Sequence, residues 1–344
     1  MSDESRKFPL GTGQQFESPE PTDTGVPVDR SRNAATIMVT VAALASEPVT
    51  APRAFAAIHP RLVEAAAHGP GVVLGVVGPL GTLVSDLVLR PNQCAMLGRH
   101  TSCRVRFEDP GLSLRHLAVH VEPVSGGLRT RVWDLHTSTP FRTEDGLHAT
   151  AVVADGPLFI TVGQYTIGML AVDAQIAADT DVAWAALPPR EFRTQAHADV
   201  SATSEPVPDS PRSVRRSSTR ITRIPQLSRL VPRTLPTGLL FAQIAIDAGP
   251  RILVHDLALE HLRRGVLLGR YERCQAGHHC DESVSRVHLV IVAIGDTVWA
   301  IDTASTNGTT LNGDELRSAR LTGDDTLSMA GTVLYWRTFA AAAA

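Results

Sequence analysis

The chain has 344 residues, a formal net charge of −3, 43% hydrophobic residues and only 5% aromatic residues. This length allows two or three domains. The near-neutral charge provides no general attraction to nucleic acid or to an anionic membrane, so neither is expected as a partner. Its four cysteines are too few for a disulfide scaffold of this size.

Residues 1–33 are rich in Pro, Ser, Thr and Asp, which predicts a disordered tail. The tail lacks the basic-then-apolar order of a signal peptide, and the apolar run over 34–45 is shorter than the roughly 20 residues of a membrane helix. We therefore expect a cytoplasmic protein. Residues 34–69 form a short lead-in, with a helix predicted over 58–68 because Pro60 suits a first helical turn and Gly69 ends it.

Short β-rich segments separated by Gly and Pro turns fill residues 70–173 and return over 237–340. Because no helical segments alternate with them, the pattern favours β-sandwiches over a parallel α/β fold. The fold class predicted is all-β, with two sandwiches joined by a linker.

Residues 174–236 carry prolines that interrupt regular elements, and this segment is predicted to be a flexible linker. Between Ser201 and Pro236 there are seven Arg against two acidic residues, which gives a local charge of about +5. The run from Arg215 to Arg223 resembles the target of a basophilic Ser/Thr kinase, so Thr219 and Thr222 are possible phosphate acceptors. The alternative is an unmodified basic tether.

The two strand-rich regions resemble each other in sequence. Residues 96–100 match 267–271, residues 112–117 match 284–289, and residues 132–135 match 300–303. The first two pieces are similarly spaced, since Arg99 precedes Ser113 by 14 positions and Arg270 precedes Ser285 by 15. Such self-similarity predicts tandem domains.

The second region carries three short motifs where strands end. They are Gly269-Arg270, then Ser285-x-x-His288, and then Ser305-Thr306-Asn307-Gly308. An arginine fork matches two phosphate oxygens, and such charge-assisted bonds are about twice as strong as neutral ones. A serine hydroxyl and the backbone amides of a tight turn add further donors. The loops of a sandwich cluster at its ends, so these groups are predicted to form one anion site.

The three motifs in this order resemble the forkhead-associated (FHA) domain, a β-sandwich that binds phosphothreonine peptides. The resemblance implies that Arg270 and Ser285 contact the phosphate and that Arg286 adds a further phosphate contact. It also implies that Thr306 and Asn307 face the peptide. Thr306 would help to form the niche for the threonine methyl group, and Asn307 would hold the peptide backbone.

The same resemblance gives structural roles to three further residues. Gly269 belongs to the Gly-Arg motif, His288 would brace the binding loops by hydrogen bonds, and Gly308 would permit the turn.

The first region departs from the FHA pattern. Arg99, Ser113 and His116 are present, but Thr139 and Pro140 stand where the second region has Asn307 and Gly308. A threonine cannot make the paired contacts of an amide side chain, and proline removes a backbone donor. We interpret the first region as a degenerate copy, which either retains a weakened phosphate site or serves only as a partner surface. Arg115 lies one place later than Arg286, so its side chain would point to the opposite face of a strand.

The segment from Cys274 to Cys280 contains two Cys and two His in seven residues. Its spacing is not that of common structural zinc sites, and four ligands so close in sequence would strain to reach one ion. We therefore expect no bound metal and no cofactor. No nucleotide-binding loop, kinase signature or nucleophile elbow is present, so we expect a protein that is not an enzyme.

The function predicted is that of an adaptor in Ser/Thr kinase signalling. It would bind a phosphothreonine-containing protein or peptide through the second domain, with a Ser/Thr protein kinase as the other partner. The competing hypothesis is a phosphate-independent scaffold, for example in a bacterial secretion apparatus. A third class, an enzyme or metal protein built around the Cys274–Cys280 loop, has the least support.

Overall fold

The chain is built mainly from β-strands, as the sequence predicted. The computed structural model describes residues 37–39, 47–172, 175–195, 218–224, 227, 235, 240–247, 252–272, 274 and 281–339. The tail predicted over 1–33 lies outside the described residues. Residues Ala35–Ala344 form one compact unit, which contains two β-sandwiches.

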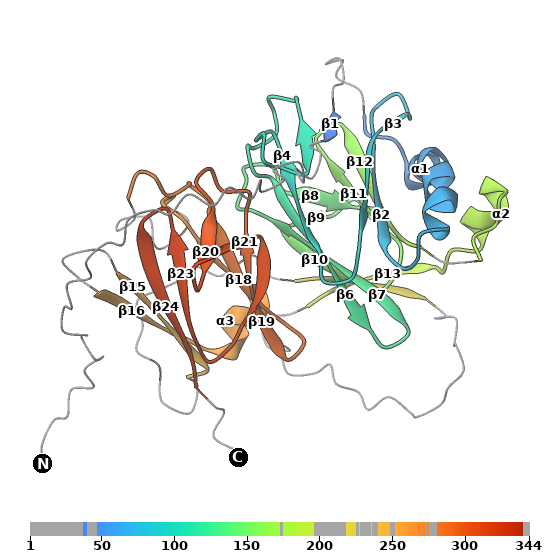
Figure 1. Cartoon of the computed structure of the whole chain (residues 1–344). Helices are drawn as coiled ribbons and strands as arrows, with labels where there is room; N and C mark the ends of the chain where they lie inside the picture. The colour runs from blue at the N-terminus through green and yellow to red at the C-terminus, as the bar shows by residue number, and fades with distance from the viewer. Residues whose placement is uncertain are drawn as a thin grey trace, which may run out of the picture. The chain divides into compact units, whose positions relative to one another are not determined.

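The first sandwich has two sheets (Figure 1). In spatial order, the larger sheet contains β1 (Ile37–Val39), β5 (Val105–Phe107), β4 (Cys94–Gly98), β6 (Leu117–Val124), β7 (Gly127–Asp134), β10 (Ala151–Ala154), β14 (Thr219–Arg223) and β13 (Arg190–Thr194). The smaller sheet contains β3 (Leu83–Leu89), β2 (Val72–Val77), β12 (Tyr165–Ala171), β11 (Leu158–Val162), β8 (Phe141–Thr143) and β9 (His148–Ala149).

The alternation of side chains along β6 shows how each face of the larger sheet is used. Leu117, Val119 and Val121 point into the core between the two sheets. Ala118 and His120 lie on the opposite face and are also buried. Because successive side chains of a strand point to opposite faces, both faces of this sheet must be covered.

A helix covers the outer face of the smaller sheet. The helix α1 (Ala51–Ala66) begins seven residues earlier than the one predicted over 58–68, because Pro52 rather than Pro60 occupies its first turn. Pro60 therefore lies inside the helix. The helix lies beside β2 (Figure 1). Phe55, Ile58 and other apolar residues of α1 pack in one cluster with residues of β2, β11 and β12.

The helix approaches the sheet closely at a pair of glycines. Gly75 of β2 and Gly168 of β12 are opposite each other in the antiparallel ladder. A Cβ atom at Gly75 would lie 2.5 Å from Ile58 Cγ1, and one at Gly168 would lie 2.6 Å from Ile58 Cδ1. Only glycine leaves room for Ile58 here, which explains the glycine in each of these two otherwise largely apolar strands.

The prediction of a flexible linker over 174–236 is wrong for several of its residues. They form α2 (Thr180–Ala185), β13 and β14, and β14 pairs with β10 on one side and with β13 on the other. Ile221 enters the core of the first sandwich. Arg223 is buried and forms an ion pair with Asp145. The alternation of Thr219, Ile221 and Arg223 toward one face overrides the basic composition of this segment.

This strand also corrects the assignment of Thr219 as an accessible phosphate acceptor. The side chain of Thr219 is fully buried. It packs so closely against Gly156 that a Cβ atom there would lie 2.5 Å from the Thr219 hydroxyl oxygen. Phosphorylation of Thr219 would therefore require β14 to leave the sheet. Thr222 is half-buried in the same strand.

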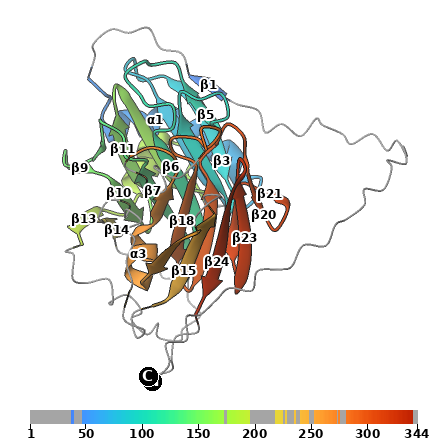
Figure 2. The ribbon, with the colours of Figure 1, turned by 90° about the vertical axis from the view of Figure 1, so that its left-hand side faces the viewer.

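The second sandwich also has two sheets. In spatial order, one contains β16 (Ile252–Leu257), β15 (Ala242–Asp247), β24 (Thr332–Thr338), β23 (Asp324–Met329), β20 (Thr309–Leu311) and β21 (Asp314–Leu316). The other contains β17 (Val266–Leu268), β18 (Leu289–Ile294), β19 (Thr297–Asp302) and β22 (Ser318–Leu321). The helix α3 (Leu259–Arg264) packs beside β18 (Figure 2). No helix among the described residues has the length and apolar character needed to cross a bilayer.

A third apolar cluster joins the two sandwiches. The first sandwich contributes residues of β4, β6 and β7 such as Ala118 and Trp133, and the second contributes residues of β17, β18 and β19 such as Val290 and Trp299. The ring centroids of His120 and Trp299 lie 5.5 Å apart. The outer face of the larger sheet of the first sandwich is thus covered by the second sandwich.

Candidate functional site

Backbone hydrogen bonds bring the first two predicted motifs together. The chain leaving β17 runs beside the loop that precedes β18. The Arg270 amide donates to the Ser285 carbonyl over 3.1 Å, and the Tyr271 amide donates to the Arg286 carbonyl over 3.0 Å. The backbones of Arg270 and Ser285 are therefore direct neighbours, although 15 positions separate them in the chain.

Gly269 is required by the closeness of these two segments. A Cβ atom at this position would lie 2.3 Å from the carbonyl oxygen of Arg286 and 2.9 Å from that of Ser285. Both distances are shorter than real Cβ contacts, and both neighbouring atoms belong to backbone. The glycine of the Gly-Arg motif therefore sets the separation between the Arg270 and Ser285 segments.

The hydroxyl of Ser285 contacts the third motif. The amide of Thr306 donates to Ser285 Oγ over 3.0 Å, and Ser285 Oγ lies 3.4 Å from Thr306 Oγ1. Ser285 is buried, whereas Thr306 is exposed. Ser285, a predicted phosphate contact, and Thr306, a predicted peptide contact, are thus direct neighbours.

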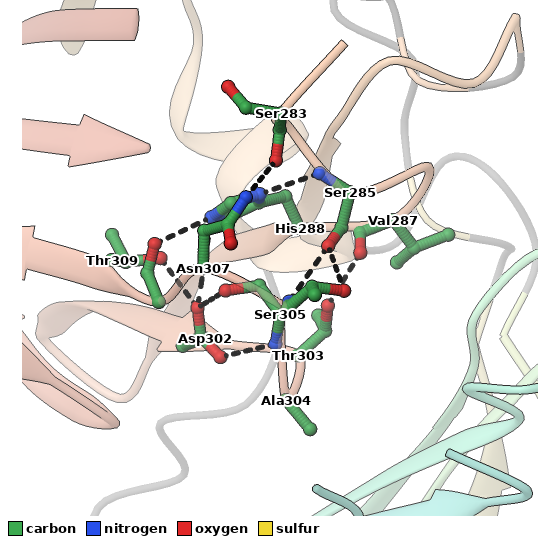
Figure 3. Close-up of polar contacts among 12 residues, drawn as sticks. Ser283, Ser285, Val287, His288, Asp302, Thr303, Ala304, Ser305, Asn307 and Thr309 are labelled. Atoms are coloured by element: carbon green, nitrogen blue, oxygen red, sulfur yellow. Dashed lines mark hydrogen bonds and ion pairs between the residues drawn. The ribbon is translucent and has the colours of Figure 1, made fainter. Parts of the chain in front are cut away.

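His288 ties the same two loops together from the interior. Its Nδ1 accepts the Ser285 amide over 3.0 Å, so Nε2 carries the proton and donates to the Gly308 carbonyl, also over 3.0 Å (Figure 3). The ring is fully buried. Burial lowers the pKa of His288, although the Gly308 carbonyl and Asp302 favour its charged form. A neutral imidazole fits both hydrogen bonds.

Asp302, for which no role was predicted from the sequence, shapes the 303–308 loop. Its carboxylate accepts the Ser305 amide over 2.8 Å, the Ser305 hydroxyl over 2.6 Å and the Thr309 hydroxyl over 2.5 Å (Figure 3). Between these residues Ala304 adopts a left-handed conformation with φ of 58°. An Asp followed three positions later by Ser is the sequence signal for such a side-chain-stabilised turn.

The remaining predicted residues are exposed on the segments that form the site. Asn307 is exposed, and its Nδ2 donates to the Ser283 carbonyl over 2.8 Å. Arg270 and Arg286 are also exposed. Two exposed arginines, an exposed threonine and an exposed asparagine thus belong to the segments that meet at the buried Ser285, and residues of these types can bind an anion attached to a peptide.

The first sandwich repeats many of these contacts. The Arg99 amide donates to the Ser113 carbonyl over 3.1 Å, and the Ser113 amide donates to His116 Nδ1, also over 3.1 Å. A Cβ atom at Gly98 would lie 2.3 Å from the Leu114 carbonyl oxygen. Asp134 accepts the amide and hydroxyl of Thr137 over 2.7 Å and 2.5 Å. Each of these contacts has a counterpart of the same kind in the second sandwich.

The first sandwich differs at the third motif. His116 Nε2 lies 3.1 Å from the Thr139 carbonyl, so Thr139 takes the place of Gly308 rather than that of Asn307, as sequence spacing had suggested. Pro140 follows directly. In addition, Arg99 Nε donates to the Leu112 carbonyl of its own sandwich over 2.5 Å. Burial lowers the pKa of His116 to about 4.

The cysteine and histidine segment lies mostly outside the described residues. Of its two Cys and two His, only Cys274 is described. It is buried, and its Sγ donates to the Arg286 carbonyl over 3.4 Å. The part of the chain that the structure describes contains no group of three or more potential metal ligands.

Comparison with protein families identifies residues 266–330 as a match to the FHA domain. These residues contain β17, all three motifs and most of the second sandwich. No match was found among curated proteins. The family model matches only this part of the chain, and the first sandwich lies outside it.

Solved structures of FHA domains are also similar to part of the chain. One comes from a study of phosphothreonine-dependent FHA interactions, with 24% identity over 29% of this chain and 98% of that chain and a TM-score of 0.25. EmbR of Mycobacterium tuberculosis, in complex with a low-affinity phosphopeptide, has 22% identity over 29% of this chain and 25% of that chain, also with a TM-score of 0.25. The FHA domain of CT664 from Chlamydia trachomatis has 20% identity over 29% of this chain and 99% of that chain, with a TM-score of 0.26.

Proposed function

We propose that the second sandwich binds a phosphothreonine peptide at the rim formed by residues 269–271, 283–288 and 303–308. The observation that carries the proposal is the hydrogen-bonded convergence of Arg270, Ser285 and Thr306, within a segment that matches the FHA domain. This match favours a binding module rather than an enzyme.

The residue roles follow from the geometry and the chemistry of phosphate. Arg270 and Arg286 supply charge-assisted donors from the exposed rim. The 3.4 Å contact from Ser285 Oγ to Thr306 Oγ1 is long for a hydroxyl pair, so a phosphate oxygen can replace it as the acceptor of the serine proton. Asn307 then holds the peptide backbone, and Thr306 contributes to the niche for the threonine methyl group.

We further propose that the first sandwich is a degenerate relative of the second. The support is the repeated set of contacts at Gly98, Arg99, Ser113 and His116. Arg99 and Ser113 provide at most a weakened phosphate site, because the third motif ends in Thr139 and Pro140 and lacks an asparagine. The protein would then be an adaptor with one competent phosphopeptide site.

The ligand would be the product of a Ser/Thr protein kinase, since phosphothreonine is formed by such enzymes. This places the protein in kinase signalling as a reader of the modification. A cytoplasmic location is part of this proposal and comes from the sequence analysis.

The test is titration of the full chain with three fluorescent peptide pools that share random flanking residues and carry a central phosphothreonine, phosphoserine or threonine. We expect binding to follow the order phosphothreonine, phosphoserine, threonine. Arg270→Ala should weaken phosphothreonine binding at least about tenfold, because a charged hydrogen bond is worth about 1.5–3 kcal/mol.

The matched control is Arg337→Ala. Arg337 is an exposed arginine near the end of β24, whereas the site lies near the start of that strand, where the Ala330 carbonyl accepts the Ser283 hydroxyl. This control should bind like the wild type. Equal binding of all three pools would refute the proposal and favour the phosphate-independent scaffold. Equal binding by Arg270→Ala and Arg337→Ala would remove Arg270 from the site.

A further inference from the structure

Arg115 belongs to the first sandwich but binds the second. It lies in the turn before β6, and its Nε and Nη2 donate to the carbonyl oxygen of Ala304 over 2.9 Å and 2.6 Å. Its Nη2 also donates to Thr306 Oγ1 over 3.4 Å. The first sandwich therefore contacts the loop that carries Thr306 and Asn307.

This contact is too buried to be an incidental surface pair. Arg115 is only 9% exposed. Burial lowers the pKa of Arg115, although Cys103 and Asp302 favour its charged form. A guanidinium in such a place needs well-formed hydrogen bonds to offset the loss of hydration. The planar fork directs two N–H groups at a single oxygen, which a lysine cannot reproduce.

The carbonyl that Arg115 binds belongs to a conformation that needs support. Ala304 has φ of 58°, and a non-glycine residue in the left-handed region costs about 1–2 kcal/mol. Asp302 supports the loop from within the second sandwich through Ser305 and Thr309 (Figure 3). Arg115 supports it from the first sandwich, at Ala304 itself.

The contact is not reciprocal, because the second sandwich has no arginine at the position that corresponds to Arg115. Arg115 lies two residues after Ser113, and Val287 lies two residues after Ser285. Val287 has no side-chain donor and is part of the apolar cluster between the sandwiches. His136 in the first sandwich has a φ of 59°, similar to that of Ala304, so both loops adopt the turn. Among the described residues, the hydrogen bonds from Arg115 go to the loop of the second sandwich.

We propose that Arg115 is a positioning residue for the phosphopeptide site of the second sandwich. It fixes the 303–308 loop in the conformation that presents Thr306 and Asn307 to the peptide. The first sandwich therefore stabilises the binding loop of the second sandwich. This inference rests on the proposed function for its effect on binding. Its effect on the loop is independent of any ligand.

Binding is measured on the full chain with the phosphothreonine peptide pool. Arg115→Ala should weaken binding about tenfold. Arg115→Lys should recover only part of the loss, because it restores the charge without the fork. The control is Arg142→Ala, which removes an exposed arginine of β8 in the same sandwich and should leave binding unchanged. If the wild type binds the pool, identical affinities for Arg115→Ala and Arg142→Ala would overturn the proposal.

Amide hydrogen exchange over residues 303–309, without ligand, separates this proposal from the proposed function. We expect exchange there to accelerate several-fold in Arg115→Ala and not in Arg142→Ala. If the wild type binds no phosphopeptide but exchange over residues 303–309 still accelerates in Arg115→Ala, the proposed function fails and the positioning role stands. Unchanged exchange overturns the positioning role whatever the binding data show. If Arg115→Ala does not fold, Arg115→Lys gives the same comparison with the charge retained.

Discussion

Replacing Gly269 by alanine tests whether the spacing of the two motif segments controls the site. The added Cβ atom would lie 2.3 Å from the Arg286 carbonyl oxygen, whereas ordinary contacts begin at 3.4 Å. The segments must therefore separate by about 1 Å, which would lengthen the 3.1 Å and 3.0 Å amide bonds of Arg270 and Tyr271 beyond hydrogen-bonding range. Losing two such bonds costs about 2 kcal/mol, and the overpacking costs about 1–3 kcal/mol.

The assays are urea unfolding of the full chain and binding of the phosphothreonine pool. We expect Gly269→Ala to lower the free energy of unfolding by about 3–5 kcal/mol and to abolish binding. The control is Gly313→Ala. A Cβ atom at Gly313 meets nothing within 4 Å, so this change costs only the strain of a φ of 96°. A Gly269→Ala variant as stable as Gly313→Ala, with normal binding, would refute the reasoning.

Three further predictions concern the loop and the buried histidines. Asn307→Ala should weaken phosphopeptide binding less than Arg270→Ala in the same titration, because it removes neutral bonds rather than a charge; equal losses would show that the two roles are wrongly ranked. Asp302→Ala should lower the free energy of urea unfolding by about 3–5 kcal/mol, because Ser305 and Thr309 lose a largely buried, charged acceptor; a loss below about 1 kcal/mol would contradict this. Stability should also fall as the pH drops from about 6.5 toward 4. Burial lowers the pKa of His116 and of His120 to about 4, so the unfolded chain takes up these protons first. At pH 5 the loss should be about 2 kcal/mol per histidine, and unfolding curves that do not change between pH 7 and 5 would exclude it.

The sequence predicted the all-β fold because its strands are marked by local patterns and by Gly and Pro turns. It also predicted that the Arg270 and Ser285 segments converge, since both lie at strand ends. The backbone bonds between these segments agree with that expectation. Asp302 also carries a local signal in its spacing from Ser305, although no role was predicted for it.

Other features depend on contacts that no local pattern reveals. The basic composition around Arg223 predicted a tether, but β14 is placed by pairing with β10 and by burial of Ile221. The start of α1 was missed because two prolines compete for a first helical turn. The role of Arg115 was not predictable, because it depends on how the face of one sandwich packs against the other.

The pairing of β14 with β10 has a consequence for biosynthesis. Val152 and Arg223 are partners across the ladder but lie about seventy residues apart, and such non-local pairings form slowly. Domains generally fold in order of emergence from the ribosome. The first sandwich cannot seal its core at Ile221 until β14 has been translated, so its unfinished sheet edge would stay open while the intervening segment emerges. During this interval the β10 edge presents unpaired N–H and C=O groups to any other strand that it meets.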